Sequence, residues 1–393
     1  MKKTLFFLMA FAGTAMAVTE INVTGSTTLT EDGVKADAQG WDEKKAGFYF
    51  GGEGKDESLT FEAGTYAATN IWGINVRNMS AANSITLTLK DGAKVTAEQQ
   101  SSTFTSKNTT ITLGDNASFS ANGSAWGQKM SFAGVDTDSK ATLTLGNSAT
   151  LTTRNGFNVE NSVAEMKLTL GQNATMSVND GQVNLNATKT TLTLGKNSTF
   201  STNKDIVLGT NAESLTLNME NGASIDWQDA ATSIKFGNQA AVTINYGTLA
   251  DGSAPTISLK GVCTLGLTTT INAAVDMDAL LASEDKTMNA VLFHITTDVS
   301  DRVITLGTDL VHLDGWSDDK YLGVLTLSGD VYTDAEGQVV DIAAMNANDE
   351  IYYALVKTDG GKTLSLMAHA PEPATATLSL LALAALASRR KRH

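Results

Sequence analysis

The residues whose types could support catalysis are three pairs of closely spaced carboxylates. Two neighbouring acids can cleave a glycosidic bond, one as the general acid and the other as base or nucleophile. The pairs in this chain are Asp136 with Asp138, Asp226 with Asp229, and Asp318 with Asp319. None of them recurs at a regular interval with a basic partner. We therefore expect solvated loop acids, no catalytic residue and no enzymatic activity.

The other reactive side chains are few and scattered. They are the four histidines and the single cysteine: His294, His312, His369, His393 and Cys263. The histidines lack the spacing of metal ligands, and one cysteine cannot form an internal disulfide. The sequence therefore predicts no metal ligand, no cofactor and no cofactor-binding residue.

The net charge and the amino-acid composition limit the classes of molecule that this protein could bind. The net charge is −14, so the surface should repel nucleic acid and acidic polysaccharide. Only 18% of the residues are charged, and glycine is frequent at 34 positions. This is typical of a polar-faced β protein with many corners, and no nucleic-acid partner is expected.

A repeated threonine-rich unit offers chemistry of a different kind, through hydroxyl and amide groups. Its clearest copy covers residues 191–200, with the sequence TLTLGKNSTF. Leu192 and Leu194 alternate with Thr191 and Thr193, which is the period of a half-buried strand. The segment 195–197 then ends the strand, because Gly and Asn tolerate the left-handed backbone of a tight corner. A second short strand and a third apolar pair complete the unit.

The unit recurs about every 24 residues, a period that marks stacked repeats. Its anchoring leucines are Leu89, Leu113, Leu145, Leu170, Leu194 and Leu217. Three strands and three corners fit this length, which predicts an all-β fold: a parallel β-solenoid whose stacked coils share one core. An antiparallel sandwich or propeller is the alternative, because alternating hairpins look similar over short windows.

Two features interrupt or decorate the repeat. The longer interval between Leu113 and Leu145 predicts an insertion over residues 126–140, a loop leaving one corner. Asn116, Asn173 and Asn197 fall at the same corner of successive units, where we expect their amides to bond from coil to coil.

The regions around the array are less regular. Residues 18–80 are predicted to be an N-terminal cap of irregular coils, 81–260 the solenoid array, and 261–370 a smaller β-rich C-terminal region. The first contains an aromatic cluster, expected to cap the open core, with a sugar-stacking platform as the alternative: Trp41, Phe48, Tyr49, Phe50 and Phe61. In the last region we expect a helical turn at 277–281 and a hairpin turn at 359–361.

The N-terminus predicts export. Lys2 and Lys3 precede an apolar run over 4–12, and the small residues Ala15 and Ala17 flank Met16 as in a signal-peptidase site. Residues 1–17 are thus predicted to be a signal peptide, and the mature chain should begin at Val18.

The C-terminus has three ordered parts. The tripeptide Pro371-Glu372-Pro373 precedes an apolar segment at 374–387, predicted to be a short hydrophobic transmembrane helix. A run of about 15 apolar residues is short for a permanent span. The basic tail follows, and it should hold that end in the cytoplasm: Arg389, Arg390, Lys391 and Arg392.

These three parts resemble a PEP-CTERM sorting signal over residues 371–393. The resemblance implies that an exosortase-type membrane enzyme recognises the tripeptide, that the helix is a transient anchor, and that the basic tail is a stop. It further implies cleavage near the tripeptide and transfer to the cell surface or outer envelope, or release outside the cell. An ordinary C-terminal membrane anchor is the alternative.

The repeat array separately resembles the autotransporter-type β-helix passengers and adhesins of Gram-negative bacteria. Together the two resemblances imply an exported structural or adhesin-like protein of the cell surface or extracellular matrix. Glycans or envelope components are the candidate ligands. A β-helix carbohydrate-active enzyme, a polysaccharide lyase or hydrolase, is the alternative function, and a surface-layer protein without a ligand is a third.

Overall fold

The structure is a computed structural model. It describes residues 19–23, 25–29, 46–50, 55–66, 71–76, 82–97, 101–121, 129–204, 206–208, 212–227, 233–236, 241–250, 254–259, 262–265, 269–285, 287–296, 304–306, 312–314, 323–324, 326–328, 331–333, 338–341 and 352–369. The predicted signal peptide with Val18, and the predicted sorting signal at 371–393, lie outside these ranges.

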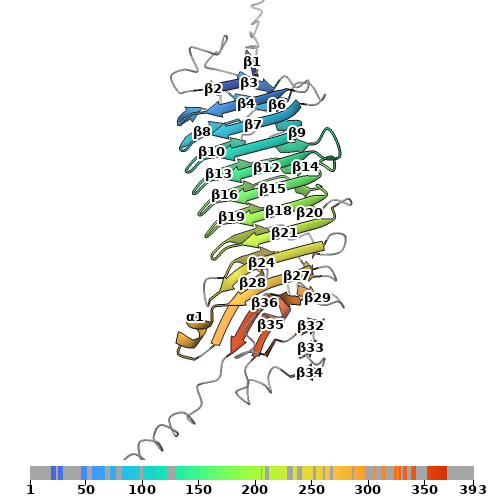
Figure 1. Cartoon of the computed structure of the whole chain (residues 1–393). Coiled ribbons are helices and arrows are strands. Elements are labelled where there is room, and N and C mark those ends of the chain that lie inside the picture. The colour runs from blue at the N-terminus through green and yellow to red at the C-terminus, as the bar shows by residue number, and fades with distance from the viewer. Residues whose placement is uncertain are drawn as a thin grey trace, which may run out of the picture.

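The described strands stack into a parallel β-solenoid with three faces (Figure 1). We name the faces sheets A, B and C, in the order in which each coil visits them. The strands of sheet A are β1 (Thr19–Val23), β3 (Ala46–Phe50), β6 (Ile71–Val76), the first part of β9 (Ser102–Leu113), β11 (Met130–Ala133), β14 (Phe157–Val159), β17 (Val183–Leu185) and β20 (Ile206–Leu208).

Sheet B provides the longest regular face. Its strands are β2 (Ser26–Leu29), β4 (Asp56–Phe61), β7 (Ala82–Leu89), the second part of β9, β12 (Lys140–Leu145), β15 (Glu165–Leu170), β18 (Lys189–Leu194), β21 (Ser214–Met219), β24 (Ala241–Leu249), β27 (Thr269–Val275) and β30 (His312–Asp314).

Sheet C closes each coil. Its parallel strands are β5 (Gly64–Tyr66), β8 (Ala93–Thr96), β10 (Ser118–Ala121), β13 (Thr150–Thr153), β16 (Thr175–Val178), β19 (Thr199–Thr202), β22 (Ser224–Trp227), β25 (Thr256–Leu259) and β28 (Thr287–Ile295). Three further strands, β23 (Ser233–Phe236), β26 (Val262–Leu265) and β29 (Ile304–Leu306), pair in parallel with one another.

The predicted repeat is the physical coil. Leu145 pairs with Leu170, and Leu170 pairs with Leu194, so the anchoring leucines lie directly above one another. Leu192 and Leu194 are buried, whereas Thr191 and Thr193, which alternate with them, are partly exposed. The parallel solenoid is therefore confirmed, and the antiparallel alternative is wrong for this array.

Aromatic side chains extend the core along sheet A. The rings of Phe104 and Phe132 lie 5.8 Å apart, and those of Phe132 and Phe157 lie 5.5 Å apart. Of the predicted N-terminal cluster, Phe50 and Phe61 are fully buried, so these two are core residues and cannot offer a sugar-stacking surface. Trp41 lies outside the described residues.

The predicted insertion at 126–140 is wrong in part. Residues 130–133 form β11, a regular strand that pairs with both β9 and β14. The apolar residues Met130 and Phe132 are buried in the core, and this is why the segment joins the stack. Only 134–139 forms a described loop at the corner before β12.

The C-terminal end changes the direction of pairing. β28 pairs in parallel with β25 but antiparallel with β36 (Thr363–His369), which pairs antiparallel with β35 (Tyr352–Thr358). The turn between β35 and β36 covers 359–361, which confirms the predicted hairpin. The reversed strand β36 occupies the edge of β28 on which another parallel coil would pair, so it ends the run of parallel coils in sheet C.

Smaller elements complete this end. The helix α1 (Met277–Ala282) matches the predicted helical turn, and the Asp276 carboxylate caps it by accepting from the backbone nitrogen of Ala279 at 3.0 Å. The other strands are β31 (Gly323–Val324), β32 (Thr326–Ser328), β33 (Val331–Thr333) and β34 (Val339–Val340). Within the described ranges, no helix has the length and apolarity to cross a membrane.

Candidate binding face and corner pocket

The outer surface of sheet B carries two straight columns of hydroxyl and amide side chains. We call these columns together the threonine face. The first column is Ser26, Ser58, Thr86, Thr110, Thr142, Lys167, Thr191, Thr216 and Thr243. The second is Thr28, Thr60, Thr88, Thr112, Thr144, Thr169, Thr193, Asn218, Asn245 and Asn272.

The columns form a regular lattice. Parallel strands lie about 4.8 Å apart, and alternate residues along one strand lie about 6.6 Å apart. Because side chains alternate across a strand, the leucines between the columns point inward, as Leu143 and Leu168 do. Thr and other β-branched residues suit this pleated surface. The face is thus a flat array of polar groups on a stiff support.

The two ends of the second column differ in how their polar groups are used. The Nδ2 of Asn245 donates to Oδ1 of Asn218 at 2.7 Å, and Nδ2 of Asn272 donates to Oδ1 of Asn245 at 2.7 Å. By contrast, the hydroxyls of Thr112, Thr144 and Thr169 have no hydrogen-bond partner among the residues that the structure describes. The asparagines bond to each other, and Asn218 also donates to the Thr193 hydroxyl at 3.2 Å, whereas the hydroxyls of these three threonines remain available to an external ligand.

One ion-pair group interrupts the threonine face. Glu165 lies 2.9 Å from the Lys167 ammonium and 3.4 Å from the Lys140 ammonium. The hydrogen bond from Lys167, followed by the bond from Lys140, holds the pKa of Glu165 below its usual range. The carboxylate therefore stays charged and partly neutralises the two lysines.

The corner between sheets B and C is a second repeated structure. Each corner has four residues closed by a hydrogen bond from the fourth nitrogen to the first carbonyl, as from Ala174 to Gly171 at 3.1 Å. The third residue has a positive φ: 58° at Asn116, 56° at Asn173 and 58° at Asn197. This is the requirement of a type II turn, and Asn and Gly meet it best.

The side chains that link successive corners are those of the second residue. The Asp91 carboxylate accepts from the nitrogen of Asp115 at 2.9 Å, Asp115 accepts from Asn147 at 2.7 Å, and Asn147 accepts from Gln172 at 3.0 Å. We call this series the corner ladder. The prediction that Asn116, Asn173 and Asn197 make these bonds is wrong, because a third-position residue takes part through its backbone nitrogen instead.

The first corner residue is often glycine for a steric reason. A Cβ on Gly146 would lie 2.8 Å from the carbonyl carbon of Gly114, and one on Gly171 would lie 2.8 Å from that of Gly146. Each corner therefore rests directly on the backbone of the corner before it. Glycine is needed here for close approach, whereas the left-handed backbone falls two positions later.

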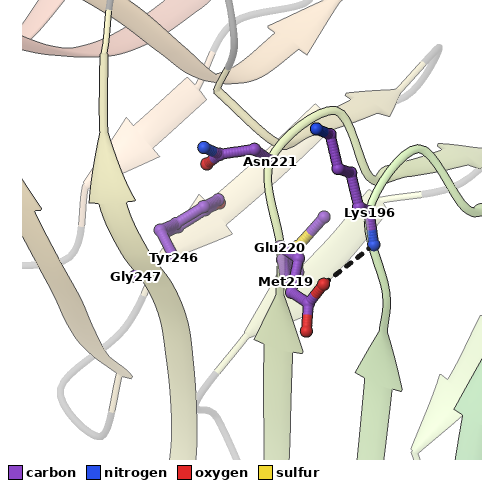
Figure 2. A pocket seen from close by; sticks show the side chains of 6 residues that line it. All are labelled: Lys196, Met219, Glu220, Asn221, Tyr246 and Gly247. Atoms are coloured by element: carbon purple, nitrogen blue, oxygen red, sulfur yellow. Dashed lines mark hydrogen bonds between the residues drawn. The ribbon is translucent and has the colours of Figure 1, made fainter. Parts of the chain in front are cut away.

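A pocket of about 320 Å³ opens beyond the last bond of the corner ladder (Figure 2). It is lined by Lys196, Met219, Glu220, Asn221, Tyr246 and Gly247, which come from the ends of β18 and β21 and from β24. Lys196, Glu220 and Asn221 are exposed, and Met219 and Tyr246 are buried. The Glu220 carboxylate accepts from the backbone nitrogen of Lys196 at 3.0 Å.

The structure describes three of the six acids in the candidate pairs: Asp136, Asp138 and Asp226. Asp136 is an exposed loop residue whose pKa is lowered mainly by a hydrogen bond from the Ser139 hydroxyl, and its carboxylate lies 3.4 Å from the Lys107 ammonium. Asp138 donates its backbone nitrogen to Asp136. Asp226 lies on β22, and Asp229, Asp318 and Asp319 lie outside the described residues.

Of the four histidines, His294 has a described side-chain contact. His294 on β28 lies with Nδ1 3.0 Å from the Thr363 hydroxyl. Where the structure describes the chain, no three His, Cys, Asp or Glu residues gather in a way that could hold a metal ion. His393 lies outside the described residues.

Comparisons with protein-family models, with curated proteins and with solved structures found no match to this chain. The candidate site therefore depends on the geometry alone. Sequence reasoning had identified the threonine and asparagine ladder, but it had missed the corner pocket. The one sequence signal was that the alternating strand pattern runs on from Asn245 to Leu249, where the neighbouring coils have a corner.

Proposed function

We propose that this chain is an exported structural or adhesive protein that contacts neutral glycans through the threonine face. One observation carries the proposal: the hydroxyls of Thr112, Thr144 and Thr169 in the second column lie in register on a stiff sheet and lack partners among the described residues. A hydroxyl both donates and accepts, so such an array complements the hydroxyls of a sugar polymer.

The charge of the chain favours a neutral ligand. The net charge of −14 opposes binding of acidic polysaccharide. On the threonine face, the described charges of Glu165, Lys140 and Lys167 lie in one ion-paired group. Specificity would therefore come from hydrogen bonds spaced at the coil repeat, which an extended polymer could meet several times along its length.

The proposed cellular location follows from the predicted sorting signals at the two termini. Signal peptidase would cleave after Ala17, and an exosortase-type membrane enzyme would process the chain at Pro371-Glu372-Pro373. The hydrophobic segment 374–387 would anchor the chain transiently, and Arg389 to Arg392 would stop its transfer. The solenoid would then stand at the cell surface or in the extracellular matrix.

The test is a glycan array combined with a product assay on the purified chain. The informative variant replaces Thr112, Thr144 and Thr169 with valine, which keeps the branched shape and removes the hydroxyls. Its matched control places the same three changes at Thr150, Thr152 and Thr175 on sheet C. Binding of neutral glycans that falls at least tenfold in the first variant alone supports the proposal.

Two other outcomes would contradict it. Equal binding by both variants would mean that the threonine face is not the contact surface. Release of new reducing ends or unsaturated sugars would instead place the chain among carbohydrate-active enzymes.

A further inference from the structure

The last bond of the corner ladder joins Gln172 to Asn147, and the backbone nitrogen of Lys196 donates to Glu220 instead of to Gln172. At Asp91, Asp115 and Asn147 the second corner residue has a side-chain oxygen that accepts from the next corner. Lysine has donors only, so Lys196 cannot accept from the backbone nitrogen of Asn221 above it. That nitrogen has no hydrogen-bond partner within the described part of the chain.

The next coil leaves the corner open. At this point β24 does not turn after Asn245: it continues to Leu249, with an irregularity between Asn245 and Gly247 and a φ of 68° at Gly247. Every earlier third-position nitrogen from Gly92 to Asn197 donates to the carbonyl of the next corner. For Gly222 the straight passage of β24 removes that acceptor, and no other partner occurs among the described residues.

The resulting pocket combines both signs of charge with an amide. Lys196, Glu220 and Asn221 lie around one opening, and the Tyr246 ring points toward it from the neighbouring strand (Figure 2). The Lys196 ammonium and the Asn221 carboxamide have no partners among the described residues. Met219 and Tyr246 are buried and form the apolar floor. The volume of about 320 Å³ is at the small end of the range for ligand sites.

We infer that this pocket is a subsite for one residue of a neutral saccharide. The carboxylate of Glu220 would accept from sugar hydroxyls, while the Lys196 ammonium and Asn221 amide would donate to them. The pocket begins one residue after Asn218 and Asn245 of the second column, so a chain on the threonine face can extend into it. This inference rests on the proposed function, and it names the place where the bound glycan is oriented.

The net charge of the chain disfavours acidic sugars, the closest competing ligand class, although the Lys196 ammonium alone would attract them. An acidic sugar would meet the Glu220 carboxylate on the rim as well as the negative charge of the whole chain. A neutral sugar has no charge to be repelled. Its hydroxyls can accept from the Lys196 ammonium and the Asn221 amide and can donate to the Glu220 carboxylate.

The test compares four variants of the full chain by calorimetry with a soluble cello-oligosaccharide. Glu220→Gln and Lys196→Met alter the pocket. Glu213→Gln and Lys204→Met are the matched controls, because both residues are exposed and Glu213 lies at the opposite end of the same strand, β21. We expect about a tenfold weaker Kd for each pocket variant, the loss that follows removal of a hydrogen bond to a charged group, and no change for the controls.

A second measurement gives a readout that does not depend on a mutation. Acylation of the Lys196 amine, followed by mass spectrometry, should be slowed by the cello-oligosaccharide and not by an oligogalacturonate, with Lys204 as the internal reference. Unchanged labelling of Lys196 at saturating cello-oligosaccharide would overturn the subsite.

Failure of the inference can be distinguished from failure of the proposed function. If the wild-type chain binds, the threonine-face variant does not, and both pocket variants bind normally, the subsite is wrong and the face remains. If the wild-type chain binds neither the array nor the cello-oligosaccharide, both proposals are wrong. Tighter binding of the oligogalacturonate would also overturn the neutral-sugar assignment.

Discussion

The carboxylate of Asp91 accepts a hydrogen bond of 2.9 Å from the backbone nitrogen of Asp115, which lies 24 residues later in the chain. Asp115 repeats the contact with Asn147, and Asn147 repeats it with Gln172. Each of these coils thereby holds the corner of the next through a side chain as well as through the sheet. The corner ladder is a stabilising element distinct from the hydrophobic core.

The Asp115→Ala change should lower the free energy of unfolding by about 1 kcal/mol, because it removes the acceptor for the nitrogen of Asn147. Asp115→Asn keeps a side-chain oxygen in place and should cost much less. Urea unfolding of the two variants measures the difference. Equal losses would mean that charge, and not the hydrogen bond, supports the corner.

The Gly171→Ala change should lower the free energy of unfolding by about 1–3 kcal/mol, the usual range for overpacking. Its Cβ would lie 2.8 Å from the carbonyl carbon of Gly146 and 3.0 Å from the nitrogen of Asn147, so the backbone must shift. Thermal and urea unfolding check this.

The control for that substitution is Asn173→Gly in the same corner. Asn173 has a φ of 56°, a conformation that glycine adopts freely, so this variant should stay within about 0.5 kcal/mol of wild type. A larger loss for Asn173→Gly than for Gly171→Ala would contradict the assignment of close approach to the first position and left-handed backbone to the third.

The Phe132→Ala change should lower the free energy of unfolding by about 3–5 kcal/mol, because the ring is buried between those of Phe104 and Phe157. Phe132→Leu fills more of the space and should cost less. Val207→Ala, at a side chain that is 37% exposed, is the control for an apolar deletion at the surface. A similar cost at positions 132 and 207 would refute the core assignment of the ring.

The Glu165→Gln change should reduce stability by less than about 1 kcal/mol near neutral pH, the usual range for surface ion pairs. Hydrogen bonds from Lys167 and Lys140 hold the folded pKa of Glu165 below the ordinary value of 4.5. A depressed folded pKa gives stability that is present above the unfolded pKa and is lost as pH falls through the folded pKa. The difference between wild type and variant should therefore disappear well below pH 4.5, which urea titrations at several pH values will show.

The Lys196→Asn change should raise the free energy of unfolding by about 1 kcal/mol, because an asparagine here repeats the geometry of Asn147 and supplies an acceptor for the nitrogen of Asn221. Lys204→Asn, at another exposed corner, should have no such effect. Thermal unfolding compares the two. A loss of stability in Lys196→Asn would show that the open nitrogen is satisfied in another way.

Local periodicity in the sequence determined the coil. Alternation of Leu192 and Leu194 with Thr191 and Thr193 dictates which side chains face the core, and the interval of about 24 residues dictates which leucines stack. The hairpin turn at 359–361 and the helical turn at 277–281 were predictable for the same reason, since each depends on a few adjacent residues. The predicted signals at 1–17 and 371–393 also depend on sequence alone, and they stay predictions.

The tertiary structure decided what depends on contacts between coils. It showed that Asp91 and Asp115, and not Asn116, link the corners, because the register places each second-position side chain beside the next backbone nitrogen. It also showed that Met130 and Phe132 belong to the core and that β24 passes the corner without turning. Such features join residues that are tens of positions apart, and no local pattern records their distance or direction.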